Sequence, residues 1–482
     1  MNDIIEAMED KNLFGSLFKD PATWAAWRVY LRALFGIPIE GEADLKIFRE
    51  CTGLDEQHTQ RIRESFLICG RRSGKSFILS LAAVYLACFR DWSSYLSPGE
   101  TGRIFIVAVD RRQAKVIKNY ISGILTAVPL LESMVDAETT ESIRLTNGIE
   151  IEIKTANFRG LRGYTLLAAL VDELAYFYSE NSASPDREVI ASLRPALSTI
   201  PESLLVGLSS PYGRSGILYQ QHQAYFGKPG STLIWRAKSV VMNPTIDREL
   251  IRKAMEDDRE AALSDWEAEW RQDISSFLPV DMIQGVVIEG RYEIPYIDGR
   301  LFFGHIDPSG GRGDSFCQAI TSRDPNGKII LHAVRERKPP FQPEGVVAEF
   351  AALLKAYKIT TVESDAYAGT WPVEQFAKQG ILVKMCDKNS SELYLELLPV
   401  ISQGSVEILD NKRLISQLSG LTRRTRPGGR DQITHFPGAH DDLAVCLAGA
   451  VYQASRKQFE RHFHWLSDGM DDDAIWERKF GT

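Results

Sequence analysis

A short apolar segment, Ser65 to Cys69, runs into the loop Gly70-Arg71-Arg72-Ser73-Gly74-Lys75-Ser76 and then into a longer apolar segment, Phe77 to Phe89. A phosphate-binding loop requires this order of strand, glycine loop and helix, because N–H groups of the loop and of the helix N-terminus bind phosphate oxygens. In such a loop Lys75 reaches the β- and γ-phosphates, and the Ser76 hydroxyl can bind Mg²⁺. The segment therefore predicts a nucleotide-binding site in an α/β domain, in which strands of a sheet alternate with helices along the chain.

A second motif supports this site, which matters because the loop departs from the usual spacing: Cys69 stands where the first glycine is expected. The apolar strand Leu166 to Val171 ends in Asp172-Glu173, where the Asp can hold Mg²⁺ and the Glu can activate the attacking water. Alone, this pair could equally well be an ordinary helix cap after a strand. Together with the loop, it predicts that the nucleotide is hydrolysed.

Further candidates for this chemistry are arginines and a serine pair. An arginine can stabilise the charge of the phosphoryl-transfer transition state, although a solvated surface arginine is an equally good interpretation of each one. Ser209-Ser210-Pro211 follows the strand Leu204 to Leu208, where it could sense the γ-phosphate; taken alone, a strand-ending turn is the favoured interpretation. The candidate arginines are Arg71 and Arg72 in the loop and Arg159 and Arg162 just before the second motif.

The second half carries a different set of acids. Asp307 follows the apolar strand Leu301 to Ile306, and Asp365 follows another strand, Thr361 to Ser364, in which Glu363 is an alternative. Two Mg²⁺ or Mn²⁺ ions bridged by three or four such carboxylates can activate a water and stabilise the leaving oxygen of a phosphodiester. His440-Asp441-Asp442 opens an apolar helix, where an Asp also has an innocent role as a cap. Three acids in this order predict a metal-dependent nuclease site.

The pattern of elements gives the fold class. With 482 residues, the chain is long enough for two or three domains. Alternating strands and helices in the first half indicate a doubly wound α/β sheet, and three early strands followed by alternating helices and strands indicate an RNase H-like second half. We expect a helical extension over 1–48, a P-loop ATPase domain over 49–236, a linker subdomain over 237–296, an RNase H-like nuclease domain over 297–455 and a tail over 456–482.

Composition limits the partners. The formal net charge of −8 does not indicate a nucleic-acid binder, so any contact with DNA must come from local basic surface. The densest basic run, Arg423 to Arg430, could grip phosphates beside the acids or could be a solvated loop. The six cysteines are scattered, which favours a reducing compartment and argues against structural zinc. No apolar stretch is long enough to span a bilayer, so we expect a cytoplasmic protein without a membrane partner.

In their order, these motifs resemble those of the large terminase subunit of tailed bacteriophages. The resemblance runs from about Trp24 to Tyr452. Its most specific elements are the loop Gly70 to Ser76, Val171-Asp172-Glu173, Ser209-Ser210-Pro211 and His440-Asp441-Asp442-Leu443.

The resemblance implies a DNA-packaging motor. An N-terminal P-loop ATPase of the ASCE or RecA-like type would drive double-stranded DNA into a procapsid, and a C-terminal RNase H-like endonuclease would cut the concatemer. The implied cofactors are ATP and Mg²⁺, with Mn²⁺ possible at the nuclease site. The implied partners are double-stranded DNA, a small terminase subunit and a portal protein. The chain would form a homo-oligomeric ring on the procapsid, in the cytoplasm of the infected bacterial host.

Carried over residue by residue, the resemblance implies specific roles. Gly70 to Ser76 and Asp172 bind nucleotide and Mg²⁺, Glu173 is the catalytic base, and Ser209 and Ser210 couple hydrolysis to motion. Asp307, Asp365, Asp441 and Asp442 are catalytic metal ligands. Arg28 stands where a glutamine contacting adenine is expected, and the aromatic tail from Arg456 is either a docking segment or a disordered terminus.

Two other functions fit parts of the pattern. The first is an ATP-dependent helicase or remodeller whose second half is a non-catalytic DNA-binding module. It predicts a second RecA-like lobe, whereas the second half offers converging acids. The other is a viral structural protein that retained a P-loop fold without catalysis.

Overall fold

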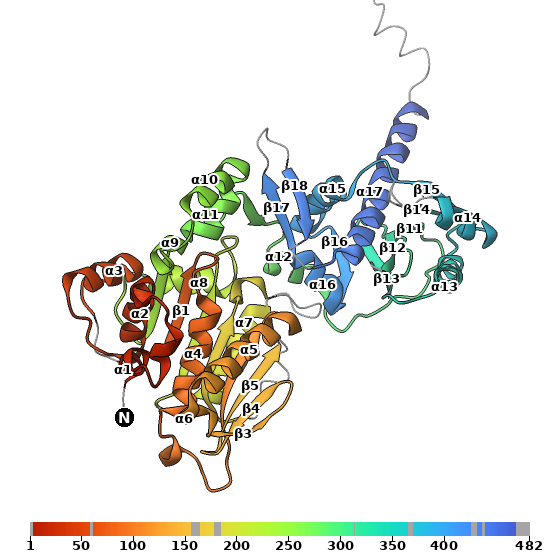
Figure 1. The fold of residues 1–482 in the computed structure, drawn as a ribbon. Coiled ribbons are helices and arrows are strands. Elements are labelled where there is room, and N and C mark those ends of the chain that lie inside the picture. Colours follow the sequence, from red (N-terminus) through yellow and green to blue (C-terminus); the bar gives the residue numbers. More distant parts are fainter. Residues whose placement is uncertain are drawn as a thin grey trace, which may run out of the picture. The chain divides into compact units, whose positions relative to one another are not determined.

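The computed structural model describes residues 3–57, 61–155, 164–177, 185–312, 314–364, 370–425, 431–435 and 439–468, with side chains up to residue 456 in the last range. The chain divides into two compact units, the first ending at Ser275 and the second continuing from Ser276. Figure 1 shows both as layers of helices on a sheet. The finer division into five segments stays a prediction.

The described strands of the first unit form an eight-stranded sheet. Its central strands are parallel, and a strand lies between the one that enters the glycine loop and the one that ends in Asp172. This insertion is the ASCE arrangement, so the predicted P-loop fold class is confirmed. The order across the sheet is β3 (Val135–Glu138), β4 (Ser142–Leu145), β5 (Ile149–Thr155), β2 (Gly102–Ala108), β6 (Leu166–Asp172), β7 (Leu204–Ser209), β1 (Glu64–Cys69) and β8 (Thr232–Ala237).

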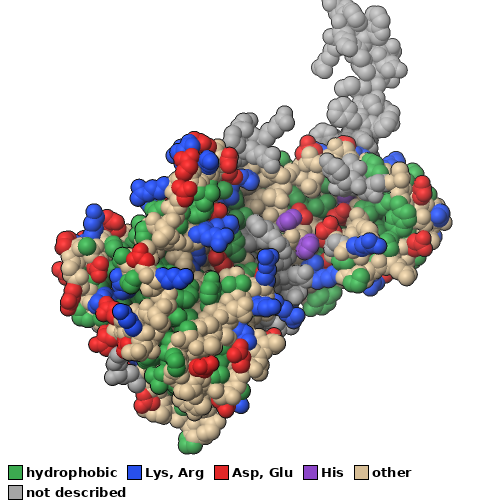
Figure 2. All heavy atoms as spheres, viewed as in Figure 1, with side chains coloured by type: hydrophobic (Ala, Val, Ile, Leu, Met, Phe, Trp, Pro, Cys, Tyr) green, Lys and Arg blue, Asp and Glu red, His purple; other side chains and the backbone are tan. Residues whose placement is uncertain are grey.

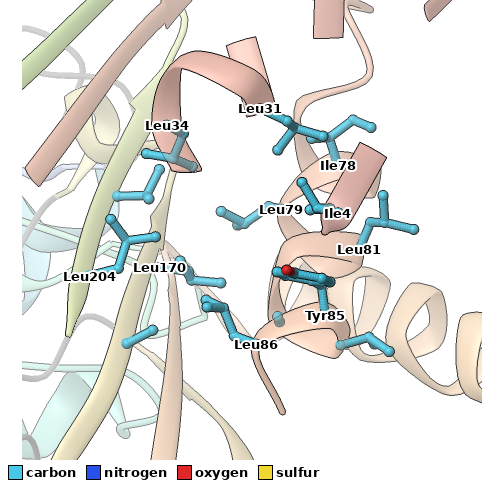
Figure 3. Packing of buried hydrophobic residues seen from close by; sticks show 14 of the residues in the cluster. Ile4, Leu31, Leu34, Ile78, Leu79, Leu81, Tyr85, Leu86, Leu170 and Leu204 are labelled. Atoms are coloured by element: carbon cyan, nitrogen blue, oxygen red, sulfur yellow. The ribbon is translucent and has the colours of Figure 1, made fainter. Parts of the chain in front are cut away.

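Helices cover both faces of this sheet, which is why its central strands are almost wholly apolar. On β1, Leu67 faces one cluster of buried side chains and Phe66 faces the other. Figure 3 shows the first cluster, in which Ile4, Leu31 and Leu34 pack around α4. The helices are α1 (Ile4–Glu9), α2 (Ala25–Phe35), α3 (Glu42–Thr52), α4 (Lys75–Cys88), α5 (Arg111–Ala127), α6 (Pro129–Glu132), α7 (Pro185–Leu197), α8 (Gly216–Tyr225), α9 (Ser239–Met242), α10 (Arg248–Asp257) and α11 (Arg259–Glu267).

The second unit has its own sheet, in which β11, β12 and β13 are antiparallel and β14 and β15 continue parallel to β11. This is the predicted RNase H-like arrangement. The order is β10 (Val287–Ile288), β16 (Val406–Leu409), β13 (Ile329–Arg337), β12 (Phe316–Arg323), β11 (Phe302–Asp307), β14 (Thr361–Ser364) and β15 (Leu382–Met385). Separately, β17 (Leu421–Thr425) pairs with β18 (Asp431–His435) as a hairpin, and the short strand β9 spans Ile274–Ser276.

Helices lie on both faces of the second sheet as well. One buried cluster includes residues of α12 (Val280–Gln284), α15 (Ser390–Ser402), α16 (Lys412–Ser419) and α17 (Asp442–Asp468), and the other includes residues of α13 (Pro343–Ala356) and α14 (Thr370–Lys378). Phe303 belongs to the first cluster and Ile306 to the second. Since side chains alternate along a strand, Asp307 lies on the face covered by α17.

One glycine fixes how closely α17 approaches this sheet. A Cβ at Gly449 would lie 2.2 Å from Nδ1 of His305, which is fully buried on β11. We expect Gly449→Ala to lower the free energy of unfolding by about 1–3 kcal/mol through overpacking. The matched change Gly345→Ala, in α13 of the same unit, adds a Cβ with nothing within 4 Å, so it should be neutral or stabilising. Thermal unfolding of both variants checks this, and equal losses would contradict it.

Candidate functional sites

The glycine loop lines a cavity of about 670 Å³ in the first unit. Gly70 has no room for a side chain, because a Cβ there would lie 2.1 Å from Oγ of Ser239 and 2.7 Å from the Asp265 carbonyl oxygen. Gly74 has φ +92°, the left-handed conformation that favours glycine, and α4 begins at the next residue. The two glycines therefore bring the backbone and the N-terminus of α4 to the cavity.

Three side chains hold the loop from outside the cavity. Trp27 Nε1 donates to the carbonyl oxygen of Ser73 at 2.7 Å, and the Ser239 hydroxyl donates to that of Arg71 at 2.7 Å. Asn243 Nδ2 donates to the carbonyl oxygen of Arg72 at 2.8 Å. Because these carbonyls are engaged by donors outside the cavity lining, the loop is fixed in a conformation suited to present N–H groups to an anion.

Lys75 and Ser76, which are predicted to bind phosphate and Mg²⁺, line this cavity, and Asp172 contacts Ser76. Lys75 is buried, and its ammonium donates to the carbonyl oxygens of Cys69 at 3.1 Å and Gly70 at 2.9 Å. The Ser76 hydroxyl donates to Oδ2 of Asp172 at 2.9 Å, although 96 residues separate them. A hydroxyl and a carboxylate in contact are a donor set that fits Mg²⁺.

Asp172 is fully buried, and burial raises its pKa to about 6, with the Glu173 charge as the next cause. Gln113 Nε2 also donates to Asp172 Oδ2, at 2.8 Å. A buried carboxylate of this kind gains from a cation beside it.

Glu173 lines the cavity and has φ +52°, a conformation that is uncommon for a residue with a Cβ. Such strain is frequent where a functional side chain must be aimed. The Ser209 hydroxyl donates to Glu173 Oε2 at 3.1 Å, and the Ser210 hydroxyl donates to the Tyr176 hydroxyl at 3.3 Å. The predicted coupling serines thus contact the predicted base and its neighbour, while their coupling role stays a prediction.

The candidate arginines differ in position. Arg71 lines the cavity, and its Nε lies 3.0 Å from Oδ1 of Asp265. Arg72 also lines the cavity, with φ +62°. Arg159 and Arg162 lie outside the described residues.

Sequence reasoning missed part of the cavity wall. Gln113 and Tyr120, on α5, line the cavity, and so does Phe77. Phe77 and Tyr120 form an edge-to-face pair with ring centroids 5.7 Å apart, and Tyr120 is 41% exposed. The sequence feature that could have indicated α5 is Asp110, which caps the start of this helix directly after β2. Because β2 and β6 are parallel neighbours, α5 begins at the same end of the sheet as Asp172. The guanidinium of Arg28 instead donates to the Pro21 carbonyl oxygen.

A second site lies on the α17 face of the second sheet. Asp307 is opposite Cys317, and Cys317 is opposite Glu336, so the three side chains lie on one face of the ladder. Asp442, in the first turn of α17, brings a carboxylate oxygen within 4.8 Å of ligand atoms of both Cys317 and Glu336. Asp307 and Asp442 are the predicted ligands in this set, and Cys317 and Glu336 were not anticipated.

Electrostatics places the remaining predicted acid with them. The Tyr394 hydroxyl donates to Asp441 Oδ2 at 2.8 Å. Burial raises the pKa of Tyr394, and the charges of Asp441, Asp307 and Asp442 raise it further. Asp441 therefore contacts the buried Tyr394 phenol directly, and the charges of Asp307 and Asp442 act on the same phenol; their role as metal ligands stays a prediction.

Asp442 fits a metal ligand. Its carboxylate is buried, and Oδ2 has no hydrogen-bond partner among the described residues. Burial raises the pKa of Asp442 to about 6, with the Asp441 charge as the next cause. Its neighbour Glu336 is already satisfied, because it accepts from the Ser315 hydroxyl at 2.8 Å and lies 2.5 Å from Arg413 Nε. A divalent cation at Asp442 would compensate a charge that the fold otherwise leaves costly.

Of the two candidate acids at the end of β14, Glu363 and Asp365, the structure describes only Glu363. Glu363 lies beside His305 in the β11–β14 register, and Arg456 Nη2 lies 3.2 Å from its Oε1. This arginine offsets part of the Glu363 charge, and the choice between Glu363 and Asp365 stays open. Asp365 lies outside the described residues.

The predicted basic run is described only in part. Arg423 belongs to β17, and its Nε lies 3.4 Å from Asp431 Oδ2, whereas residues 426–430 are outside the described part.

No protein-family model matches the sequence, and no curated protein matches it. Among solved structures, the chain is similar to the HK97 bacteriophage large terminase at 13% identity and a TM-score of 0.36, over 81% of this chain and 91% of that chain. The chain is also similar to the large terminase of the thermophilic bacteriophage D6E in complex with ADP, at 11% identity and a TM-score of 0.36, over 88% of this chain and 97% of that chain. A third similar structure is the large terminase nuclease of thermophilic phage G20c with bound magnesium, at 21% identity and a TM-score of 0.31, over 36% of this chain and 94% of that chain.

All three are large terminases. The sequence motifs resemble those of the same family. Across the described residues, no helix is both long enough and apolar enough to cross a membrane.

Proposed function

We propose that this chain is a viral DNA-packaging enzyme that hydrolyses ATP in its first unit and cuts double-stranded DNA in its second. The observation that carries the proposal is the presence of two acid sites, one in each unit of the same chain. One joins Asp172 to the hydroxyl of the glycine loop, and the other gathers Asp307, Asp441 and Asp442 around Tyr394. ATP hydrolysis would drive DNA into a procapsid, and the endonuclease would cut concatemeric DNA.

In the first site, the loop N–H groups and Lys75 would bind the phosphates of ATP. Ser76 and Asp172 would hold Mg²⁺, which supplies positive charge to the phosphate oxygens. Glu173, held by Ser209, would accept the proton of the attacking water, so that the proton ends on its carboxylate.

In the second site, Asp307, Asp441 and Asp442 would hold Mg²⁺ or Mn²⁺, with Asp365 a further candidate. The metals would supply an activated water and stabilise the leaving oxygen. Tyr394 would orient the Asp441 carboxylate through its hydrogen bond.

The proposed partners follow from this role. They are double-stranded DNA, a small terminase subunit, a portal protein and further copies of this chain in a ring on the procapsid. The proposed location is the cytoplasm of the infected bacterial host.

The helicase alternative has less support. A second RecA-like lobe would be built on a parallel sheet, whereas β11, β12 and β13 are antiparallel. The acids on this sheet would also have no role in a simple DNA-binding module.

The purified full chain tests the proposal in two assays. Phosphate release from ATP should rise on addition of double-stranded DNA, and supercoiled plasmid should be cut with Mg²⁺ or Mn²⁺ but not with a chelator. Unwinding of a forked duplex without any cutting would favour the helicase, and absence of both activities with partner subunits present would favour the structural protein.

The aromatic side chains that line the ATP cavity, Phe77 and Tyr120, predict where the adenine base of ATP binds. We expect Tyr120→Ala to weaken ATP binding by about tenfold, since an exposed aromatic ring gives a base a stacking surface worth about 1–3 kcal/mol. Binding of inorganic tripolyphosphate, which has no base, should be unaffected. The control Tyr95→Ala removes another exposed ring outside the cavity lining. Equal losses for ATP and tripolyphosphate would contradict the assignment.

A further inference from the structure

A second hollow in the first unit has no part in the proposed ATP chemistry. It has a volume of about 530 Å³ and shares no lining residue with the ATP cavity. We call it the basic groove. Its lining residues from α5 are Arg111, Ala114, Lys115, Lys118 and Asn119, and the others are Thr140, Glu141, Ile153, Lys154 and Thr155.

The charge of the basic groove is opposite to that of the chain as a whole, which is −8. Four lining residues are cationic and one, Glu141, is anionic. Lys118 lies 2.7 Å from Glu138 and Lys154 lies 2.5 Å from Glu152. Arg111 and Lys115 are exposed at the groove. In the visible face of Figure 2, Lys and Arg side chains lie over the region where Figure 1 draws α5.

The spacing on α5 suits a polyanion. At a rise of about 1.5 Å per residue, the positions of Arg111, Lys115 and Lys118 extend over roughly 10 Å along one helix face. Uncharged donors from Asn119, Thr140 and Thr155 also line the groove, beside two apolar residues, Ala114 and Ile153. Cations with hydroxyl and amide donors are typical of contacts to a nucleic-acid backbone, whereas the core of a protein interface would be richer in aromatic and apolar side chains.

We propose that the basic groove binds the backbone phosphates of double-stranded DNA. This inference rests on the proposed function, because it assigns the DNA of that function to one surface of the ATPase unit. Gln113 and Tyr120, which line the ATP cavity, lie about 180° around the helix from Arg111 at about 100° per residue. One helix thus presents opposite faces to the nucleotide and to the DNA.

The test measures DNA binding by the full chain in chelator, which prevents cutting, over a series of salt concentrations. The double variant Arg111→Ala/Lys115→Ala should reduce the slope of log Kd against log salt by about two, and weaken binding by about 10–100-fold at low salt. The matched control is Arg248→Ala/Lys253→Ala, which removes the same charges from the exposed surface of α10. The control should keep the wild-type slope.

A double variant that keeps the wild-type slope and Kd would overturn the inference. Thermal unfolding of each variant shows whether a loss comes from misfolding. ATP hydrolysis by the wild-type preparation separates the two proposals. If the wild type hydrolyses ATP and the double variant binds DNA as the wild type does, only the assignment of DNA to the groove is wrong. If the wild type neither hydrolyses ATP nor cuts DNA, the proposed function is wrong.

Discussion

Replacing Glu173 with Gln should lower the rate of ATP hydrolysis by about 10²–10⁴-fold, because an amide cannot accept the proton of the attacking water. ATP binding should persist, since the loop, Lys75 and the Ser76–Asp172 contact are untouched. Phosphate release under single-turnover conditions measures the first effect, and equilibrium binding of a fluorescent ATP analogue measures the second.

The surface change Glu132→Gln, in α6, controls for loss of a carboxylate without loss of a base and should leave the rate unchanged. A Glu173→Gln protein that hydrolyses ATP at the wild-type rate would mean that another group takes the proton. If neither wild type nor variant hydrolyses ATP, with DNA and partner subunits present, the structural-protein alternative gains.

The changes Asp307→Ala and Asp441→Ala should each reduce metal-dependent cutting of plasmid DNA by at least about 10²-fold, because each removes one carboxylate ligand of the proposed metal ions. The two residues come from different elements, β11 and the turn before α17, yet both act on Tyr394. Conversion of supercoiled plasmid to open and linear forms, with Mg²⁺ and with Mn²⁺, measures the loss.

The change Asp298→Ala is the matched control, since Asp298 is an exposed acid of the same unit that contacts Tyr296 and Lys358. It should cut as wild type does. Cutting that survives in both site variants would place the nuclease elsewhere or attribute it to a contaminant. Thermal unfolding of the same preparations reports whether the second unit is folded.

Sequence reasoning reached the parts of each site that are contiguous along the chain. The loop Gly70 to Ser76 and the pair Asp172-Glu173 are each recognised by spacing and by the strand before them. Gln113 could not be assigned a role in the same way, because its contact with Asp172 depends on β2 and β6 being neighbours in the sheet. Strand order is set by packing of the whole unit.

The acid site shows the same division. Asp307 and Asp441-Asp442 were predictable as a strand end and a helix start. Cys317 and Glu336 were not, because only the antiparallel register of β11, β12 and β13 brings them beside Asp307. A one-residue change of register would turn these side chains to the opposite face, and local patterns do not define register to that accuracy.

The hydrogen bond from Trp27 to the Ser73 carbonyl changes what the first 48 residues are. The sequence predicts a helical extension here, and in the structure this segment supplies one of the three side chains that hold the phosphate loop. They also supply Ile4, Leu31 and Leu34 to the core around α4. A fragment that started at residue 49 would expose this apolar surface and release one side of the loop. We therefore expect a fragment that keeps the first unit folded to begin ahead of Ile4.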